Sequence, residues 1–172
     1  VPGRFSYEVF DCCRIPKAEE SFDKVSANHV LFYLKDLDGA LEEVRRGLKP
    51  DGTFFCSTYG REHMKEISQL VKEFDSRIVL SEVNLYDAFG LENGREILKR
   101  HFGRVEEILY EDHLEVRDEG PLMEYILSCH GNQQEYLSER YDEFREFLKK
   151  KIEKKGTLFV TKRAGIFRCR KN

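Results

Sequence analysis

Three polar residues stand where predicted strands end in the first third of the chain. Asp11 follows the predicted strand Phe5–Phe10, Asn28 follows Phe22–Ala27, and Thr58 closes Thr53–Thr58. In an open α/β sheet, ligands bind beyond the carboxyl ends of the strands. These residue types at this spacing therefore predict a ligand site at one edge of a sheet. Its chemistry would be mainly positioning and electrostatics.

The histidines and cysteines add no second site. His63, His101 and His113 have no acid or nucleophile at useful spacing, which favours surface or structural roles. The five cysteines follow no repeating frame, and adjacent Cys12 and Cys13 are poorly placed to share a disulfide, so we expect reduced thiols. No C-x₂-C or H-x₃-H spacing occurs, and we expect no metal site.

A strand–helix–strand unit must position the strand ends. Phe22–Ala27 reads as a strand, and Leu37, Ala40, Leu41, Val44 and Leu48 then recur at helical spacing. Lys49-Pro50-Asp51-Gly52 is expected to end this helix before the strand Thr53–Thr58. The two strands should be parallel neighbours joined by a right-handed crossover.

This segment resembles class I S-adenosylmethionine-dependent methyltransferases of the small-molecule type. The landmarks are Asp11, Phe22-Asp23, Asn28-His29-Val30-Leu31 and Leu48-Lys49-Pro50-Asp51-Gly52, the last being the most specific. The resemblance covers Phe5 to about Gly60 well. It is looser further on, where it rests on strand order and on Ala164-Gly165-Ile166-Phe167.

The resemblance implies roles for four residues in binding S-adenosylmethionine. Asp11 would accept a hydrogen bond from the adenine amino group, and the backbone N–H of Cys12 would face the ring. Asn28 and His29 would line the methionine and methyl end. Two alternatives stay open: Asp11 as an ordinary turn acid, and His29 as a helix-entry residue satisfied by backbone.

The acceptor side is less defined. Tyr33 and Tyr59 could face a small-molecule acceptor, although packing with a satisfied hydroxyl is the alternative. The resemblance implies a lid that sets substrate choice within residues 82–132, built from Glu82–Asn93 and Leu122–Asn132. Many methyl transfers need no acid–base residue, so catalytic residues stay unknown.

The resemblance also implies the fold: α/β, Rossmann-like, with sheet order 3-2-1-4-5-7-6 and an antiparallel last strand. Phe5–Phe10, Phe22–Ala27, Thr53–Thr58, Val105–Val116 and Thr157–Cys169 would be strands three to seven. No glycine-rich cofactor turn occurs, Gly3 stands alone, and the first residue is Val1. We therefore expect one N-terminally truncated domain over residues 1–172, the C-terminal part of a methyltransferase and inactive by itself.

Truncation would leave the edge of Phe22–Ala27 open. We expect another copy of the chain to cover it, as in a dimer, or Phe5–Phe10 to move into the vacant place. Further predicted elements are helices over 62–74, 94–101, 122–129 and 133–155, an irregular or briefly helical segment over 82–90, and a bulge at Ala164-Gly165 in the last strand.

Composition favours a soluble, cytoplasmic protein. The 172 residues carry a net charge of only −3 despite 35% charged residues, so no strong field attracts nucleic acid or membrane. The run Lys149-Lys150-Lys151 reads as a solvated helix face. Neither a membrane span nor a signal peptide is seen. The function classes left are a methyltransferase and a non-catalytic module for self-association or partner binding; a nucleic-acid modifying enzyme is disfavoured.

Overall fold

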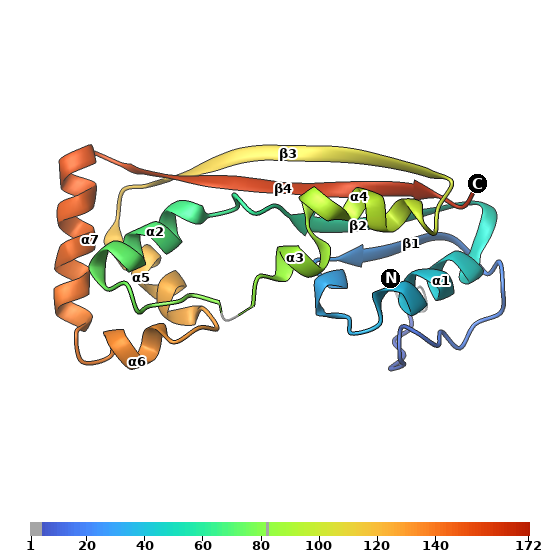
Figure 1. Cartoon of the computed structure of the whole chain (residues 1–172), viewed down its shortest axis with the longest axis horizontal. Helices are drawn as coiled ribbons and strands as arrows, with labels where there is room; N and C mark the ends of the chain where they lie inside the picture. The colour runs from blue at the N-terminus through green and yellow to red at the C-terminus, as the bar shows by residue number, and fades with distance from the viewer. Residues whose placement is uncertain (1–4, 82) are drawn as a thin grey trace. The chain divides into compact units, whose positions relative to one another are not determined.

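The computed structural model describes residues 5–81 and 83–172. Val1, Gly3 and Glu82, the first residue of the expected lid region, lie outside the described residues. Within them, one sheet holds strands in the order β1-β2-β4-β3 (Figure 1). The strands are β1 (Phe22–Asn28), β2 (Leu48–Tyr59), β3 (Arg104–Val116) and β4 (Leu158–Arg170). With β1 taken as strand four, this is the predicted order 4-5-7-6. The partial Rossmann-like fold is confirmed.

The predicted strand–helix–strand unit is present. β1 and β2 are parallel, and helix α1 (Leu37–Gly47) connects them after the short 3₁₀ turn η1 (Leu31–Tyr33). The Asp36 side chain caps α1 by accepting from the Gly39 N–H at 2.9 Å. Ala40, Leu41 and Val44 are buried, as their spacing predicts. Figure 1 draws the arrow of β4 opposite to those of β1 and β2, so the sheet is mixed.

The start of β2 differs from the prediction. β2 begins directly after α1, and its register with β1 moves from Phe22↔Leu48 to Lys24↔Thr53. The residues predicted to stop the helix, Lys49-Pro50-Asp51-Gly52, therefore form an irregular opening of the strand. Proline, which has no N–H to donate to a ladder, is tolerated there.

The chain divides into two compact units. Unit 1 comprises Val1–Thr58, Asp87–Ile108 and Gly165–Asn172. Its core includes Leu41, Phe54, Phe89, Leu98 and Phe167, all fully buried. Helix α4 (Leu91–Lys99) contributes Leu98, and α3 (Leu85–Phe89) ends in Phe89. The Phe89 and Phe167 rings meet edge to face at 5.9 Å.

Unit 2 comprises Tyr59–Tyr86 and Leu109–Ala164 and is mostly helical. Its helices are α2 (Lys65–Phe74), α5 (Glu119–Ser128), α6 (Gln133–Leu137) and α7 (Tyr141–Lys155). They pack around a core of aliphatic and aromatic residues that includes Val71, Met123, Ile126, Phe144 and Leu148. Gly156 ends α7 with a positive φ of +75°, which glycine adopts without the steric cost of a Cβ.

Two predicted elements are wrong. Phe5–Phe10 forms no strand: Phe5, Tyr7 and Val9 are 78%, 94% and 105% exposed, and no neighbouring strand offers the segment a ladder. Its movement to the edge of β1 is also wrong, because within the described residues β1 pairs only with β2.

The second is the helix over 133–155, which is interrupted between α6 and α7. Arg140 precedes α7 with φ −117° and ψ 24°, outside the helical region. Its guanidinium donates to the Asp75 carboxylate at 2.9 Å and lies 4.4 Å from the centroid of the Phe74 ring. These two contacts attach Arg140 to the end of α2 at the point where α6 and α7 are separated. Hydrophobic periodicity in the sequence does not predict either contact.

The remaining elements lie close to their predicted positions. Gly120-Pro121, expected to precede a helix, stand instead in the first turn of α5, which Asp118 caps. β4 is continuous, and its buried positions change phase between Val160 and Gly165, around the predicted bulge. The lid over residues 82–132 contains α3, α4, β3 and α5, and both it and the single-domain boundary stay predictions.

Candidate ligand-binding edge

The carboxyl ends of β1 and β2 meet at one corner of unit 1. Asn28, the last residue of β1, is in register with Ser57. The His29 backbone N–H donates to the Ser57 carbonyl oxygen at 3.1 Å and to Ser57 Oγ at 3.2 Å. Asn28 Oδ1 accepts from Ser26 Oγ at 3.2 Å and from Ser57 Oγ at 3.5 Å. The two predicted residues are therefore held in place by buried Ser57.

His29 has a left-handed backbone, with φ of +50°. This conformation is uncommon for a residue other than glycine, and it costs free energy that the surrounding structure must supply. The two hydrogen bonds to Ser57 pin the His29 amide while the chain turns from β1 into η1. The imidazole is exposed, with its ring centroid 6.4 Å from that of Phe32. Strained backbone of this kind clusters at ligand sites.

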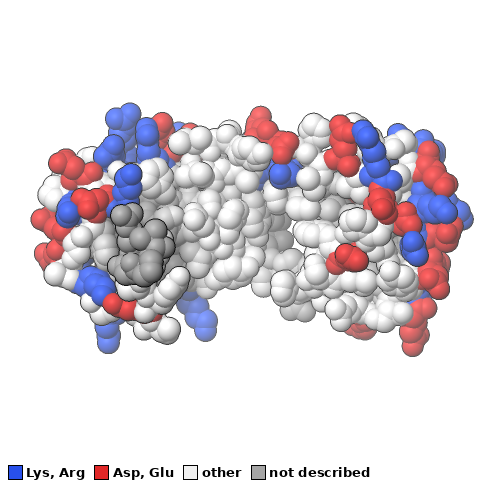
Figure 2. All heavy atoms as spheres, turned by 180° about the vertical axis from the view of Figure 1, so that it is seen from behind, with Lys and Arg blue, Asp and Glu red and all other residues white. Residues whose placement is uncertain are grey.

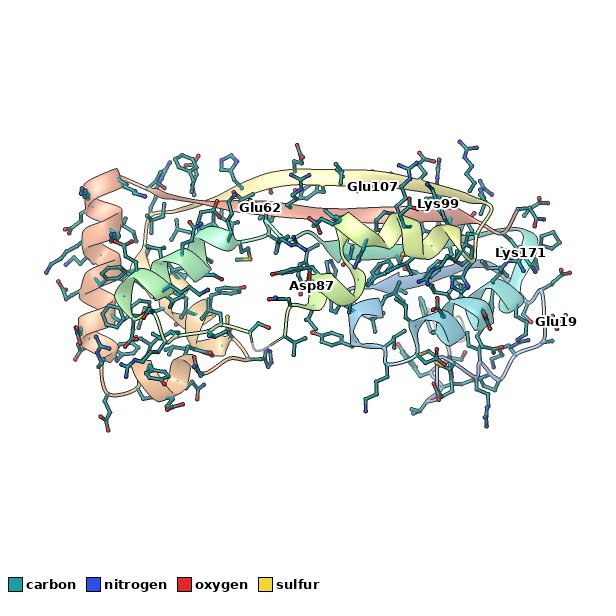
Figure 3. All side chains as sticks on the ribbon, in the orientation of Figure 1. Glu19, Glu62, Asp87, Lys99, Glu107 and Lys171 are labelled. Atoms are coloured by element: carbon teal, nitrogen blue, oxygen red, sulfur yellow. The ribbon has the colours of Figure 1, made fainter. Side chains whose placement is uncertain are left out.

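The segment 11–20 runs along α1 in unit 1. At one end, Cys13 Sγ donates to the carbonyl oxygen of Asp36, the cap of α1, at 3.4 Å. At the other end, the Glu20 N–H donates to the Arg46 carbonyl oxygen at 3.0 Å. Figure 3 labels Glu19 near that second end, together with Lys171.

This placement brings Asp11 and Cys12 close to the start of α1. Helix α1 follows β1 through η1 and a short loop (Figure 1). The Asp11 side chain accepts from the Cys13 N–H at 2.9 Å, and its carbonyl oxygen accepts from the Arg14 N–H at 2.8 Å. Asp11 thus occupies a tight turn rather than a strand end. The assignment of Asp11 and Cys12 to a ligand site stays a prediction.

The other predicted residues divide between the two units. Tyr33 belongs to unit 1, is 66% exposed, and packs edge to face on Phe32 at 4.7 Å. Tyr59 belongs to unit 2, where its ring lies 5.4 Å from that of His63. Thr58 is fully buried and donates from Oγ1 to the Phe89 carbonyl oxygen at 2.8 Å, a structural role.

Sequence reasoning missed two contributors to this edge. Ser57 fastens His29 and Asn28, and Asp36 caps α1 and holds the turn at Cys13. An aspartate just before an apolar periodic run is a recognisable helix-start signal, so Asp36 could have been found. Nothing in the local pattern distinguishes Ser57 from its neighbour Thr58.

Electrostatics at the edge are negative on the side of the turn. Burial and the neighbouring Cys12, Asp11 and Asp36 groups raise the pKa of the Cys13 thiol to about 11. Elsewhere on the surface the two signs of charge are mixed, as Figure 2 shows for the face it presents. The Asp11 carboxylate can therefore accept further hydrogen bonds, for example from a ligand's amino group.

A hollow of about 640 Å³ also lies in unit 1, among α1, the end of α4 and the end of β4. Its cations are largely engaged: Arg100 pairs with Asp38 at 3.3 Å, and Lys99 pairs with Glu96 at 2.9 Å. Lys171 donates to the Leu48 carbonyl oxygen at 2.8 Å. We therefore keep the carboxyl edge as the candidate site.

Comparison with known proteins places this edge in context. Residues 2–56 match the family described as a methyltransferase domain. Malonyl-[acyl-carrier protein] O-methyltransferase of Methylovorus sp. (strain MP688) is 32% identical over 78 residues, 45% of this chain and 26% of that protein. The chain thus spans about a quarter of that relative.

Solved structures show the same fold. A provisionally assigned methyltransferase of Bacillus halodurans C-125 aligns with a TM-score of 0.54 at 15% identity, over 94% of this chain and 69% of the other. YcgJ of Bacillus subtilis gives 0.51 at 13% identity, over 94% and 68%. The resemblance to class I methyltransferases is confirmed, in sequence across residues 2–56 and in fold across most of the chain.

Proposed function

We propose that this chain is part of an S-adenosylmethionine-dependent methyltransferase that acts on a small-molecule acceptor. The observation that carries the proposal is the carboxyl edge of β1 and β2. There the Asn28–His29 corner is fixed on Ser57, and the turn at Asp11 is held at the start of α1. Both lie within the segment that matches a methyltransferase domain.

The residues present suit the cofactor. Asp11 uses one carboxylate oxygen for the Cys13 N–H, and a carboxylate has capacity for further hydrogen bonds, here from an adenine amino group. The Cys12 N–H would face the ring, and Asn28 with His29 would bound the methionine end. When bound, the cofactor supplies the reactive methyl group. The chain's own contribution would be to hold and orient the cofactor and the acceptor.

For the acceptor we propose contacts from Tyr33 and Tyr59 and a lid within residues 82–132. The exposure of Tyr33, at 66%, supports its availability to a ligand. The relative's name refers to a malonyl group on a carrier protein, which is a larger object than the small acceptor proposed here. Both acceptor classes therefore belong in an activity screen.

The test is calorimetric titration of S-adenosylhomocysteine into this chain and into a form extended at its N-terminus. We expect binding to the extended form only, since this chain carries no glycine-rich turn. In the extended form, D11N should weaken binding about 10- to 100-fold by removing a charge-assisted hydrogen bond. D23N makes the same charge change at the start of β1, where Asp23 pairs with Lys49, and should bind normally.

Other outcomes are equally decisive. Tight binding to the 172-residue chain would show that our expectation of an inactive fragment is wrong. Failure of both forms to bind would reject the cofactor roles of Asp11 and Asn28.

A second candidate function, self-association without catalysis, rests on the open edge of β1. Within the described residues β1 pairs on one side only, with β2. Such an edge presents unpaired backbone groups to another strand. We propose a second copy of the chain as the occupant.

A further inference from the structure

The turn at residues 11–13 gathers three metal-ligating side chains. A carboxylate oxygen of Asp11, Cys12 Sγ and Cys13 Sγ all lie within 4.8 Å of one another. Adjacent cysteines do not match the C-x₂-C spacing of common zinc sites. For that reason the sequence predicted no metal site. The tight turn, not the sequence spacing, brings these ligands together.

The turn is held firmly in place. Asp11 Oδ1 accepts from the Cys13 N–H at 2.9 Å, which leaves its second oxygen available. The Ile15 N–H donates to Glu43 Oε2 at 2.9 Å, and the Arg46 guanidinium donates to the carbonyl oxygen of Ile15 at 3.0 Å. Because Glu43 and Arg46 belong to α1, the segment just after the ligand cluster is anchored to that helix.

The donor set suits a thiophilic cation. Two thiolates and one carboxylate supply three of the four tetrahedral positions that zinc and similar ions prefer. Thiolate ligands around such an ion lie somewhat under 4 Å apart, so a small contraction of the present cluster suffices. Both thiols are partly buried.

We propose that Asp11, Cys12 and Cys13 form a binding site for one thiophilic divalent cation such as zinc or cadmium. Binding forms two metal–sulfur bonds and releases the two thiol protons to solvent. The fourth position is open to water. The proposal stands without the methyltransferase assignment, but a cation and an adenine amino group would both use the Asp11 carboxylate and would compete for it.

The test titrates cadmium chloride into the reduced 172-residue chain and follows thiolate-to-cadmium charge-transfer absorption in the ultraviolet. We expect one high-affinity equivalent per chain. C12S and C13S should each weaken binding by at least about 100-fold, and D11N by about 10-fold. Circular dichroism of each variant checks that the surface turn can be altered without loss of the fold.

The matched control is C129S. Cys129 is partly exposed in unit 2, where its Sγ donates to the Tyr125 carbonyl oxygen at 3.5 Å. Cys56 and Cys169 are fully buried and should not compete. Unchanged binding in C129S supports the proposal. It is overturned by wild-type affinity in either C12S or C13S, by loss of binding in C129S alone, or by absence of the band in the wild-type chain.

Discussion

At the residue scale, single polar side chains fix backbone that hydrophobic packing leaves undecided. Ser57 holds His29 in a left-handed backbone conformation. The carbonyl oxygen of Asp36 accepts a hydrogen bond from the Cys13 thiol. Neither contact buries much apolar surface. Their effect is on shape: they set where the chain leaves β1 and where the turn meets α1, and these two places define the candidate site.

Asp75 plays the same part in unit 2 and makes stability depend on pH. Its carboxylate is 9% exposed and accepts from Arg77 at 2.6 Å and from Arg140 at 2.9 Å. The hydrogen bonds from Arg77 are the main reason that the pKa of Asp75 lies well below its ordinary value. Arg140 also bonds to Glu143, so these four charges form one network.

A lowered carboxyl pKa stabilises the folded state above the ordinary aspartate pKa of about 4, and this stabilisation is lost as pH falls toward the lowered value. We therefore expect D75N to destabilise the chain most at pH 7, with the difference from wild type shrinking below about pH 4. Urea unfolding at stepped pH measures it. A difference that stays constant down to pH 2 would contradict the ion-pair account.

At the element scale, the turn after α5 fastens the segment that follows α2. The Asn132 side chain accepts from the Val79 N–H at 2.7 Å, and the Asn132 N–H donates to the Val79 carbonyl oxygen at 3.0 Å. A Cβ on Gly131 would lie 1.7 Å from that carbonyl oxygen and 2.7 Å from Leu80 C. Both are backbone atoms, so no rotamer change makes room.

G131A should therefore break this attachment and lower the free energy of unfolding by about 2–4 kcal/mol. The control is G120A in the first turn of α5. Its Cβ would approach only the Asp118 side chain, at 3.3 Å, and alanine favours a helix over glycine by up to about 1 kcal/mol. Chemical denaturation measures the free energy of unfolding of both variants. Equal values for G131A and G120A would refute the steric argument.

Elements whose pattern and partners are local were predictable from sequence. The apolar spacing of Leu41 and Val44 gives α1, and the strands it joins pair with each other. Phe5–Phe10 has a weak strand pattern but no ladder, because pairing is a property of neighbours rather than of the segment. The break at Arg140 likewise depends on Asp75, which is distant in sequence.

In the candidate site, too, some residues could be identified from the sequence and others could not. Asn28 and His29 were found because they end a recognisable strand, whereas Ser57 works through a hydrogen bond that its own residue type does not reveal. The proximity of Asp11, Cys12 and Cys13 follows from a turn conformation, which spacing rules for metal sites do not consider.

At the scale of the whole molecule, the sheet has an end strand with an exposed edge. β1 stands first in the order β1-β2-β4-β3, and Asp23, Lys24 and Ser26 on it are exposed. None of the helices in the described part of the chain is long and apolar enough to cross a bilayer. The open edge offers a surface for assembly, and the residues of β1 indicate a register for pairing.

Antiparallel pairing of two β1 strands about a twofold axis must place residues of the same face opposite each other. A register centred on Asp23 or on Lys24 puts two like charges in contact, which is unfavourable. Centred on Val25, the midpoint of β1, all seven residues pair, and Lys24 of one copy faces Ser26 of the other. This register predicts how substitutions at Ser26 change the dimer.

S26K would set lysine opposite Lys24 twice in the dimer, and S26E would set glutamate there. Each like-charge pair costs roughly 0.2–1 kcal/mol, so S26K should raise the dimer Kd about 2- to 30-fold, while S26E should lower it or leave it unchanged. Both variants remove the hydroxyl that donates to Asn28, so this loss cancels in the comparison. Sedimentation equilibrium at low salt measures both constants. Equal constants would exclude this register, and a wild-type chain that stays monomeric at high concentration would exclude association through β1.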